Sequence, residues 1–138
     1  MGNAAISEYQ IAGQLETIFG SRTAAYVLLY IQSRGSAYAT QVADTFDMRI
    51  TAVQQQLRKF ENEGVLVSYT VGRTRVFEFN PTGATVRNLQ QFLSSELEFI
   101  ASEKSGIPRE VYRQYFSHRQ RPRRTGKSLD LVPEGLRK

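Results

Sequence analysis

The stretch from Tyr38 to Gly64 constrains the fold of this chain most, because its apolar residues follow a helical repeat in two short segments separated by a turn. In the second segment Val53, Leu57 and Phe60 recur at spacings of four and three, which places them on one side of a helix. That side must face a core. We therefore predict two helices joined by a short turn, the second with one buried and one polar face.

Four polar residues share one side of the second predicted helix, and none of the four is a carboxylate. At about 100° per residue, four side chains project within roughly 50° of a common direction, away from the core. Gln can form two hydrogen bonds to adenine in the major groove, and Arg can bind phosphate or guanine. The same residue types are also ordinary on a solvated helix surface, so composition leaves both interpretations open. The four residues are Thr51, Gln54, Gln55 and Arg58.

A β-hairpin is predicted directly after this helix. Gly64 is a typical helix end, and VLVSYTV and RVFEF have the composition of strands on either side of a turn that begins with Gly72. We expect both strands to hold core residues. Alternation places Val65, Val67, Tyr69 and Val71 on one face of the first strand, and Val76 opposite Phe77 and Phe79 in the second.

Residues 38–80, with two helices and a trailing hairpin, resemble the winged helix-turn-helix domain of prokaryotic transcription regulators such as the ArsR-type and MarR-type families. The resemblance covers about 43 of the 138 residues, or about 60 with the preceding helix. It implies a mostly α fold with a small β-hairpin (α+β). In that family the second helix, here about residues 50–63, enters the major groove of double-stranded DNA. The hairpin tip, called the wing, here residues 72–75, lies over neighbouring backbone.

The resemblance also implies which residues contact DNA. Related sequences often have Gly-Ile-Ser in the turn before the second helix, whereas this chain has Asp47-Met48-Arg49 and lacks the glycine and the small polar N-cap. Thr40, at the start of the first helix, could contact phosphate or could only cap its helix. The wing arginines could bind phosphate, although loop tips are often charged for solubility alone. The matching contact residues are Arg49, Thr51, Gln54, Gln55, Arg58, Arg73, Thr74 and Arg75.

Two helices are predicted before this unit. Residues 7–19 begin with a capping box formed by Ser7 and Gln10 and end at Gly20. The next helix runs from Ser21 to residue 34 and is apolar nearly all round, so it must be buried on most sides.

A long amphipathic helix is predicted for residues 82–104, after the hairpin. A domain of this type already has a three-helix core, so we expect this helix to pair with a second copy in a homodimer. Packing back on the body of the same chain is the alternative. The expected dimerisation residues are Val86, Leu89, Phe92, Leu93, Leu97 and Ile100.

The charge of +5 is unevenly distributed. Residues 1–103 contain 8 Lys and Arg against 10 Asp and Glu, whereas residues 104–138 contain 10 against 3. The predicted units are thus an N-terminal helix at 1–20, the DNA-binding domain at 21–81, the dimerisation helix at 82–104, and a basic tail with a short helix at 105–138. The tail could lie along DNA, bind an acidic surface of a partner subunit, or stay solvated. Its central cations are Arg119, Arg121, Arg123, Arg124 and Lys127.

Several classes of protein are disfavoured. No run of 18 apolar residues and no signal-peptide pattern is present, so we expect no membrane segment and a cytoplasmic protein. There are no cysteines, and the one histidine, His118, has no carboxylate partners close in sequence, so we expect no metal site and no cofactor. No catalytic residues and no nucleotide-binding motif are recognisable, so we expect no enzyme.

We therefore predict a DNA-binding transcription regulator, whose effector ligand, if it has one, the residues do not indicate. The alternative is a winged-helix module that binds proteins. Positive charge joining the second helix to the wing favours DNA, whereas intruding carboxylates favour a protein partner. The carboxylates that decide between the two are Glu61, Glu63 and Glu78.

Overall fold

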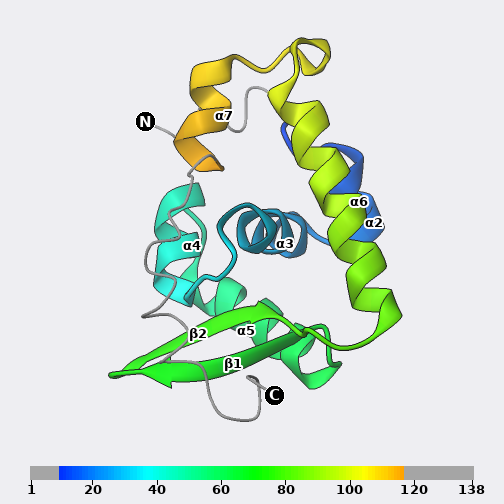
Figure 1. Cartoon of the computed structure of the whole chain (residues 1–138). Helices are drawn as coiled ribbons and strands as arrows, with labels where there is room; N and C mark the ends of the chain where they lie inside the picture. The colour runs from blue at the N-terminus through cyan, green and yellow to red at the C-terminus, as the bar shows by residue number, and fades with distance from the viewer. Residues whose placement is uncertain (1–9, 117–138) are drawn as a thin grey trace.

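A computed structural model describes residues 10–116 as a helical body with one small sheet (Figure 1). Within these residues the sheet is an antiparallel pair of strands, so the prediction of a mostly α chain with a small β-hairpin is confirmed. None of the helices in this part of the chain has the length and apolar character needed to cross a membrane. The elements are α2 (Gln14–Phe19), α3 (Arg22–Arg34), α4 (Ala39–Phe46), α5 (Ile50–Asn62), β1 (Leu66–Val71), β2 (Thr74–Phe79), α6 (Ala84–Ala101), the short 3₁₀ helix η1 (Glu103–Ser105) and α7 (Arg109–Tyr115).

Helix α3 lies at the centre of the body (Figure 1). It begins at Ser21, whose side chain accepts a hydrogen bond of 3.0 Å from the backbone N–H of Ala24, and it ends at Gly35. Every residue from Ala24 to Ile31 is buried. The helix contacts α2, α4, α5, α6 and β2, so the prediction of a helix buried on most sides is confirmed.

The turn between α4 and α5 closes without a glycine. Asp47 adopts the left-handed conformation, with φ 55° and ψ 53°, directly after α4. Asp tolerates this region better than most residues, so it can stand where related turns have glycine. Arg49 then precedes α5 in an extended conformation and makes no side-chain cap.

The hairpin packs on the body through one face. Leu66 pairs with Phe79 and Val71 with Thr74, and the turn between the strands begins at Gly72, at φ 66°. Backbone hydrogen bonds in both directions between Ala37 and Phe77, of 3.0 and 2.8 Å, attach β2 to the segment before α4. The hairpin is therefore held at a fixed position relative to α4.

The core face of β1 is not the valine face. The buried residue of β1 is Leu66, which lies on the same side of the hairpin as the buried Phe77 and Phe79. The expectation of core residues in both strands is met. Alternation placed the valines of β1 together on one face, and the structure leaves that face half-exposed. The residues of this outer face of β1 are Val67, Tyr69 and Val71.

Helix α2 is shorter than predicted. It starts at Gln14, because Gln10 and Gly13 both have positive φ, of 49° and 40°, and interrupt any earlier helical turn. Ser7 of the predicted capping box lies outside the described residues.

The apolar stripe of α6 packs inside the chain, where α6 contacts α3. Leu93 is fully buried, and Val86, Leu97 and Ile100 are at most 7% exposed. The expectation that these four residues form a dimer interface is therefore wrong, and the alternative of packing on the body holds for them. Leu89 is half-buried against the same core, and Phe92 remains 39% exposed.

Helix α7 returns to the body through aromatic rings. It begins directly after its N-cap residue Pro108, within the region where a short helix was predicted. Phe46, the last residue of α4, contacts the rings of Tyr26, Tyr30, Tyr115 and Phe116, with centroid distances between 4.7 and 5.9 Å. We call these five residues the Phe46 cluster. The cluster joins α3, α4 and the end of α7, so α7 belongs to the same core as the rest of the body.

Candidate nucleic-acid interface

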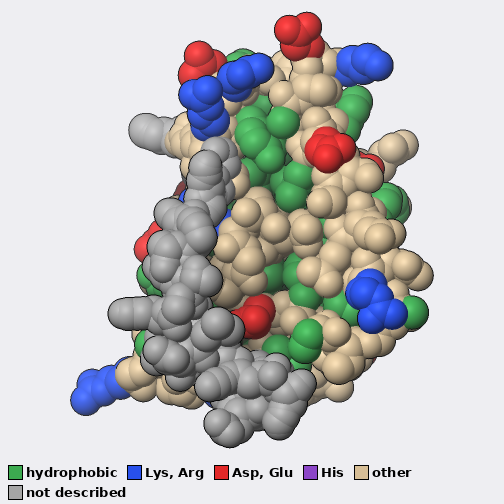
Figure 2. Space-filling model, viewed as in Figure 1, with side chains coloured by type: hydrophobic (Ala, Val, Ile, Leu, Met, Phe, Trp, Pro, Cys, Tyr) green, Lys and Arg blue, Asp and Glu red, His purple; other side chains and the backbone are tan. Residues whose placement is uncertain are grey.

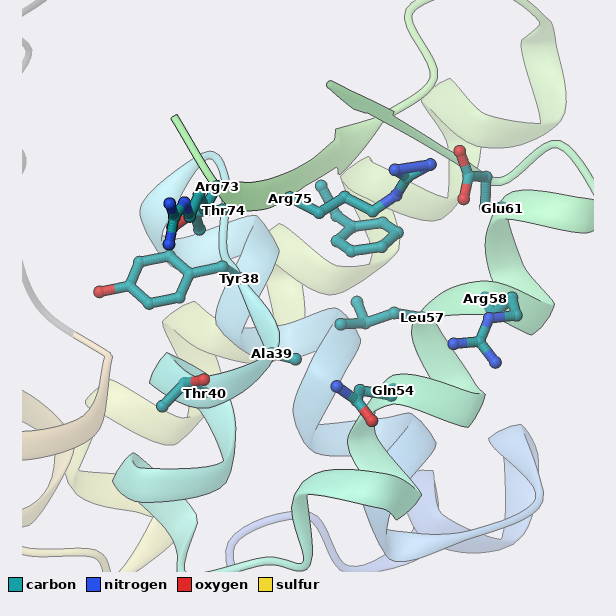
Figure 3. A pocket seen from close by; sticks show the side chains of 11 residues that line it. Tyr38, Ala39, Thr40, Gln54, Leu57, Arg58, Glu61, Arg73, Thr74 and Arg75 are labelled. Carbon is teal, nitrogen blue, oxygen red and sulfur yellow. The ribbon is translucent and has the colours of Figure 1, made fainter. Parts of the chain in front are cut away.

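A groove of about 780 Å³ lies between the start of α4, one side of α5 and the hairpin (Figure 3). Ala39, Leu57 and Phe77 give it an apolar floor. The other lining residues are polar or charged. They are Tyr38, Thr40, Gln54, Arg58, Glu61, Arg73, Thr74 and Arg75.

Helix α5 presents its predicted polar face outward. Val53 and Leu57 are fully buried, which fixes the rotation of the helix about its axis. Thr51, Gln54, Gln55 and Arg58 are consequently all exposed. Gln54 and Arg58 line the groove, whereas Thr51 and Gln55 lie outside its lining.

The hairpin tip supplies the facing wall. Arg73 and Thr74 are exposed at the turn, and Arg75 follows on the same face of β2 as Phe77. In Figure 3 the side chain of Arg75 extends from the hairpin in the direction of Glu61 on α5. Because the backbone of Phe77 is hydrogen-bonded to that of Ala37, the hairpin wall of the groove has a defined position relative to α4.

The charge of the groove lining is predominantly positive. Its charged residues are three arginines, Arg58, Arg73 and Arg75, and one carboxylate, Glu61. Glu61 accepts a hydrogen bond of 2.6 Å from the hydroxyl of Ser68 on β1. This bond connects α5 to the hairpin, which gives the carboxylate a structural role at the groove.

The other two carboxylates lie outside the groove lining. Glu63 is exposed at the end of α5. Glu78 pairs with Val67 and therefore lies on the outer face of the hairpin. Partial burial raises the pKa of Glu78, and a hydrogen bond with Tyr69 opposes this change. Burial also raises the pKa of Tyr69, and the nearby Glu78 carboxylate raises it further.

All of the predicted DNA-contact residues are exposed. The groove brings six of them together from α4, α5 and the hairpin. Thr40 is the second residue of α4 and not its N-cap, so it does not act as the cap. Arg49, Thr51 and Gln55 lie beyond the groove, at and near the start of α5. The predicted residues that line the groove are Thr40, Gln54, Arg58, Arg73, Thr74 and Arg75.

The sequence reasoning missed one exposed aromatic and one exposed aliphatic residue near this groove. Tyr38 lines the groove and is 40% exposed, and Ile50, the first residue of α5, is 39% exposed. The signal for Tyr38 was its position: an aromatic residue precedes α4 where a small polar cap is usual. The N–H of Tyr38 is instead capped by the side chain of Gln41, at 3.2 Å.

Within residues 10–116, no group of three or more His, Cys, Asp or Glu side chains is arranged to hold a metal ion. No protein-family model, no curated protein and no solved structure matches this chain.

Proposed function

We propose that this chain is a transcription regulator of the winged helix-turn-helix type that binds double-stranded DNA. Helix α5 is the recognition helix, and the hairpin is the wing. The observation that supports this best is the groove, in which polar residues of α5 and arginines of the hairpin tip line one surface with a single carboxylate. The major groove of DNA is about 12 Å wide and admits one helix.

The exposed side chains suggest a division of roles. Gln54 and Gln55 can form paired hydrogen bonds with adenine, so they would read base edges. Arg73 and Arg75 on the hairpin would bind phosphates and set the register of the protein on the duplex. Arg49, next to the start of α5, would bind phosphate on the other side of the recognition helix.

A protein-binding module is the second candidate, and particular features favour it. Tyr38 and Ile50 present apolar surface on this face, which DNA phosphates do not need. Glu61 places a negative charge in the groove. Both features suit a protein partner that offers a basic or apolar segment.

We also propose that the protein acts as a homodimer, through a surface different from the buried stripe of α6. Ile18 on α2 and Phe92 and Phe99 on α6 are 61%, 39% and 50% exposed. These three residues, which we call the α2/α6 patch, line one groove of about 500 Å³. Two copies joined there would present two α5 helices to half-sites, as dimeric regulators require.

The experiment that tests the DNA function is a fluorescence-anisotropy titration of the protein against genomic fragments, including its own upstream region. Random duplex serves as competitor, and two salt concentrations are compared. Preference for one fragment by about 10³-fold or more, with affinity falling steeply with salt, supports a sequence-specific regulator. Weak and indifferent binding to every duplex overturns it and favours the protein-binding module.

A further inference from the structure

Few large apolar side chains are exposed in residues 10–116, and one of them begins the proposed recognition helix. Figure 2 shows apolar side chains that reach the surface between α6 and α7. Ile18, Phe92 and Phe99 form the α2/α6 patch. Tyr38 lines the groove, whereas Ile50 lies outside both the patch and the groove lining, at the start of α5.

Neither core packing nor helix formation explains an isoleucine at the start of α5. Met48, two residues earlier, packs against the core, whereas Ile50 is 39% exposed. A β-branched residue is also a weaker helix former than Ala. The side chain of Ile50 is therefore available to contact a partner at this end of α5.

Ile50 lies in one row with two residues of the groove. Positions four apart on a helix differ by about 40° around its axis and are neighbours on its surface. Ile50 is thus followed by Gln54 and then by Arg58, which are both exposed and both line the groove (Figure 3). At about 1.5 Å per residue the row is about 12 Å long, and it presents an apolar, an amide and a cationic group in order.

The major groove of DNA offers a partner for each group in this row. Glutamine can form paired hydrogen bonds with adenine, and arginine can bind guanine or phosphate. The apolar group that base pairs present in this groove is the 5-methyl group of thymine. Base pairs are spaced about 3.4 Å apart, so the row spans about three of them. The groove lining carries three arginines and one carboxylate, which suits the negative charge of a duplex.

We infer that Ile50 contacts the 5-methyl group of a thymine beside the adenine contacted by Gln54. This inference rests on the proposed DNA-binding function, to which it adds a second residue that selects A·T pairs. Phosphates give an isoleucine no apolar partner, so Ile50 contributes to sequence preference and not to affinity for every duplex. The contact removes about one methyl group from water, which corresponds to about threefold to fivefold in affinity.

The test removes the methyl group from the DNA and the side chain from the protein, separately and together. Each thymine of the preferred fragment is replaced in turn by deoxyuridine, which lacks only the 5-methyl group. Wild type, Ile50→Ala and Ile50→Val are titrated by fluorescence anisotropy against each duplex and against random duplex. Because Ala is a good helix former, Ile50→Ala should fold, and thermal unfolding checks this.

Thr85→Ala is the matched control. Thr85 is an exposed β-branched residue in the first turn of α6, and it lies outside the groove lining. Its replacement shortens a side chain at a comparable place in another helix. It should therefore leave the discrimination between thymine and deoxyuridine as in wild type.

We expect one thymine at which deoxyuridine costs the wild type about threefold to fivefold in affinity. At that position Ile50→Ala should bind the two duplexes equally. Ile50→Val keeps a branched apolar side chain and should still distinguish them. Affinity for random duplex should stay within about twofold of wild type in every variant, because phosphate contacts dominate nonspecific binding.

Three results overturn the inference and leave the proposed function standing, provided that wild type prefers one fragment. If no deoxyuridine replacement lowers affinity, no thymine methyl group is contacted. If Ile50→Ala keeps the wild-type discrimination at every thymine, another residue contacts the methyl group. If Ile50→Ala weakens random duplex as much as the preferred fragment, Ile50 acts without regard to sequence. If wild type prefers no fragment, the proposed function fails and the inference fails with it.

Discussion

The hydroxyl of Ser68 on β1 donates a hydrogen bond of 2.6 Å to the carboxylate of Glu61 on α5. These two residues connect α5 to the hairpin, and Glu61 is also the one carboxylate in the groove lining. The bond therefore holds the hairpin in position, and it leaves a negative charge in the groove that we propose binds DNA.

Replacement of Glu61 by Gln should strengthen DNA binding. The amide oxygen of Gln can still accept the Ser68 hydrogen bond, so thermal stability should change little. Removal of one negative charge near phosphate should raise affinity about threefold to tenfold on specific and random duplexes, and most at low salt. Glu63→Gln, at the exposed end of α5, is the matched control and should have a smaller effect. Equal gains in both variants would show that only net charge matters.

Gln55→Ala and Arg73→Ala should separate base reading from phosphate binding. Loss of Gln55 should relax sequence preference, with a cost of about 1–3 kcal/mol on the specific fragment and little on random duplex. Loss of Arg73 should weaken all duplexes alike and lower the salt slope by about one. Competition titrations with both duplexes measure the two effects. Equal effects of both changes on specific and random DNA would contradict this division.

Glu78→Gln should stabilise the fold at neutral pH. Burial raises the pKa of Glu78 above its ordinary value of 4.5, so the folded state binds a proton more tightly than the unfolded state. The contribution of Glu78 to stability is therefore full below pH 4.5 and is lost as pH rises through the raised pKa. Urea unfolding of both proteins at pH 4 and pH 7 should show the benefit of Gln at pH 7 alone. A benefit of equal size at both values would contradict the assignment.

Asp47→Val should destabilise the turn between α4 and α5. A β-branched residue in the left-handed region costs about 1–2 kcal/mol or more, whereas Asp tolerates that region. Asp44→Val, at an exposed position within α4, is the control, and it should cost well under 1 kcal/mol. Chemical denaturation measures both. A loss in Asp44→Val as large as that in Asp47→Val would attribute the effect to charge or β-branching in general.

Phe99→Ser should weaken self-association and leave the fold intact. Phe99 is 50% exposed in the α2/α6 patch, so its loss removes little buried area within one chain. If two copies meet through this patch, the dissociation constant in sedimentation equilibrium should rise at least tenfold. Ile50→Ser is the control, because Ile50 is an exposed apolar residue of α5 outside the patch. An unchanged dissociation constant for Phe99→Ser would place the interface elsewhere.

Most of the helical framework follows from local patterns. The spacing of Val53 and Leu57 fixes the rotation of α5, because those two side chains must be buried wherever the helix packs. Gly72 similarly predicts the hairpin turn from a property of one residue. These features need no knowledge of distant contacts.

Apart from the start of α2, the errors concern which surfaces pack together and not which elements form. Both sides of β1 contain apolar residues, so alternation could not show that Leu66 faces the core while Ser68 beside it is satisfied by Glu61. The apolar stripe of α6 correctly indicated that this face of the helix is buried. It did not indicate whether the same chain or a second copy covers it. A signal was present in α3, whose residues from Ala24 to Ile31 are nearly all apolar and require more cover than α4 and α5 provide.

The candidate site could be predicted only in part, because local patterns select some of its residues and long-range contacts bring in the others. Residues on the polar face of α5 share one local pattern, whereas the groove exists only because Ala37 and Phe77 hold the hairpin beside α4. That long-range pairing explains why Thr40 and Arg75, far apart in sequence, line one groove. It also brings in Tyr38, which no local pattern had selected.

The burial of α3 from Ala24 to Ile31 limits how the proposed DNA-binding unit could be exchanged between proteins. A recombination event that transferred only residues 21–81 would separate α3 from α2 and α6 and leave part of its apolar surface open to water. Such a transfer would succeed only in a host that supplied a replacement for those two helices. The smallest unit that can be inherited intact is therefore set by what covers the central helix, and it is larger than the part proposed to touch DNA.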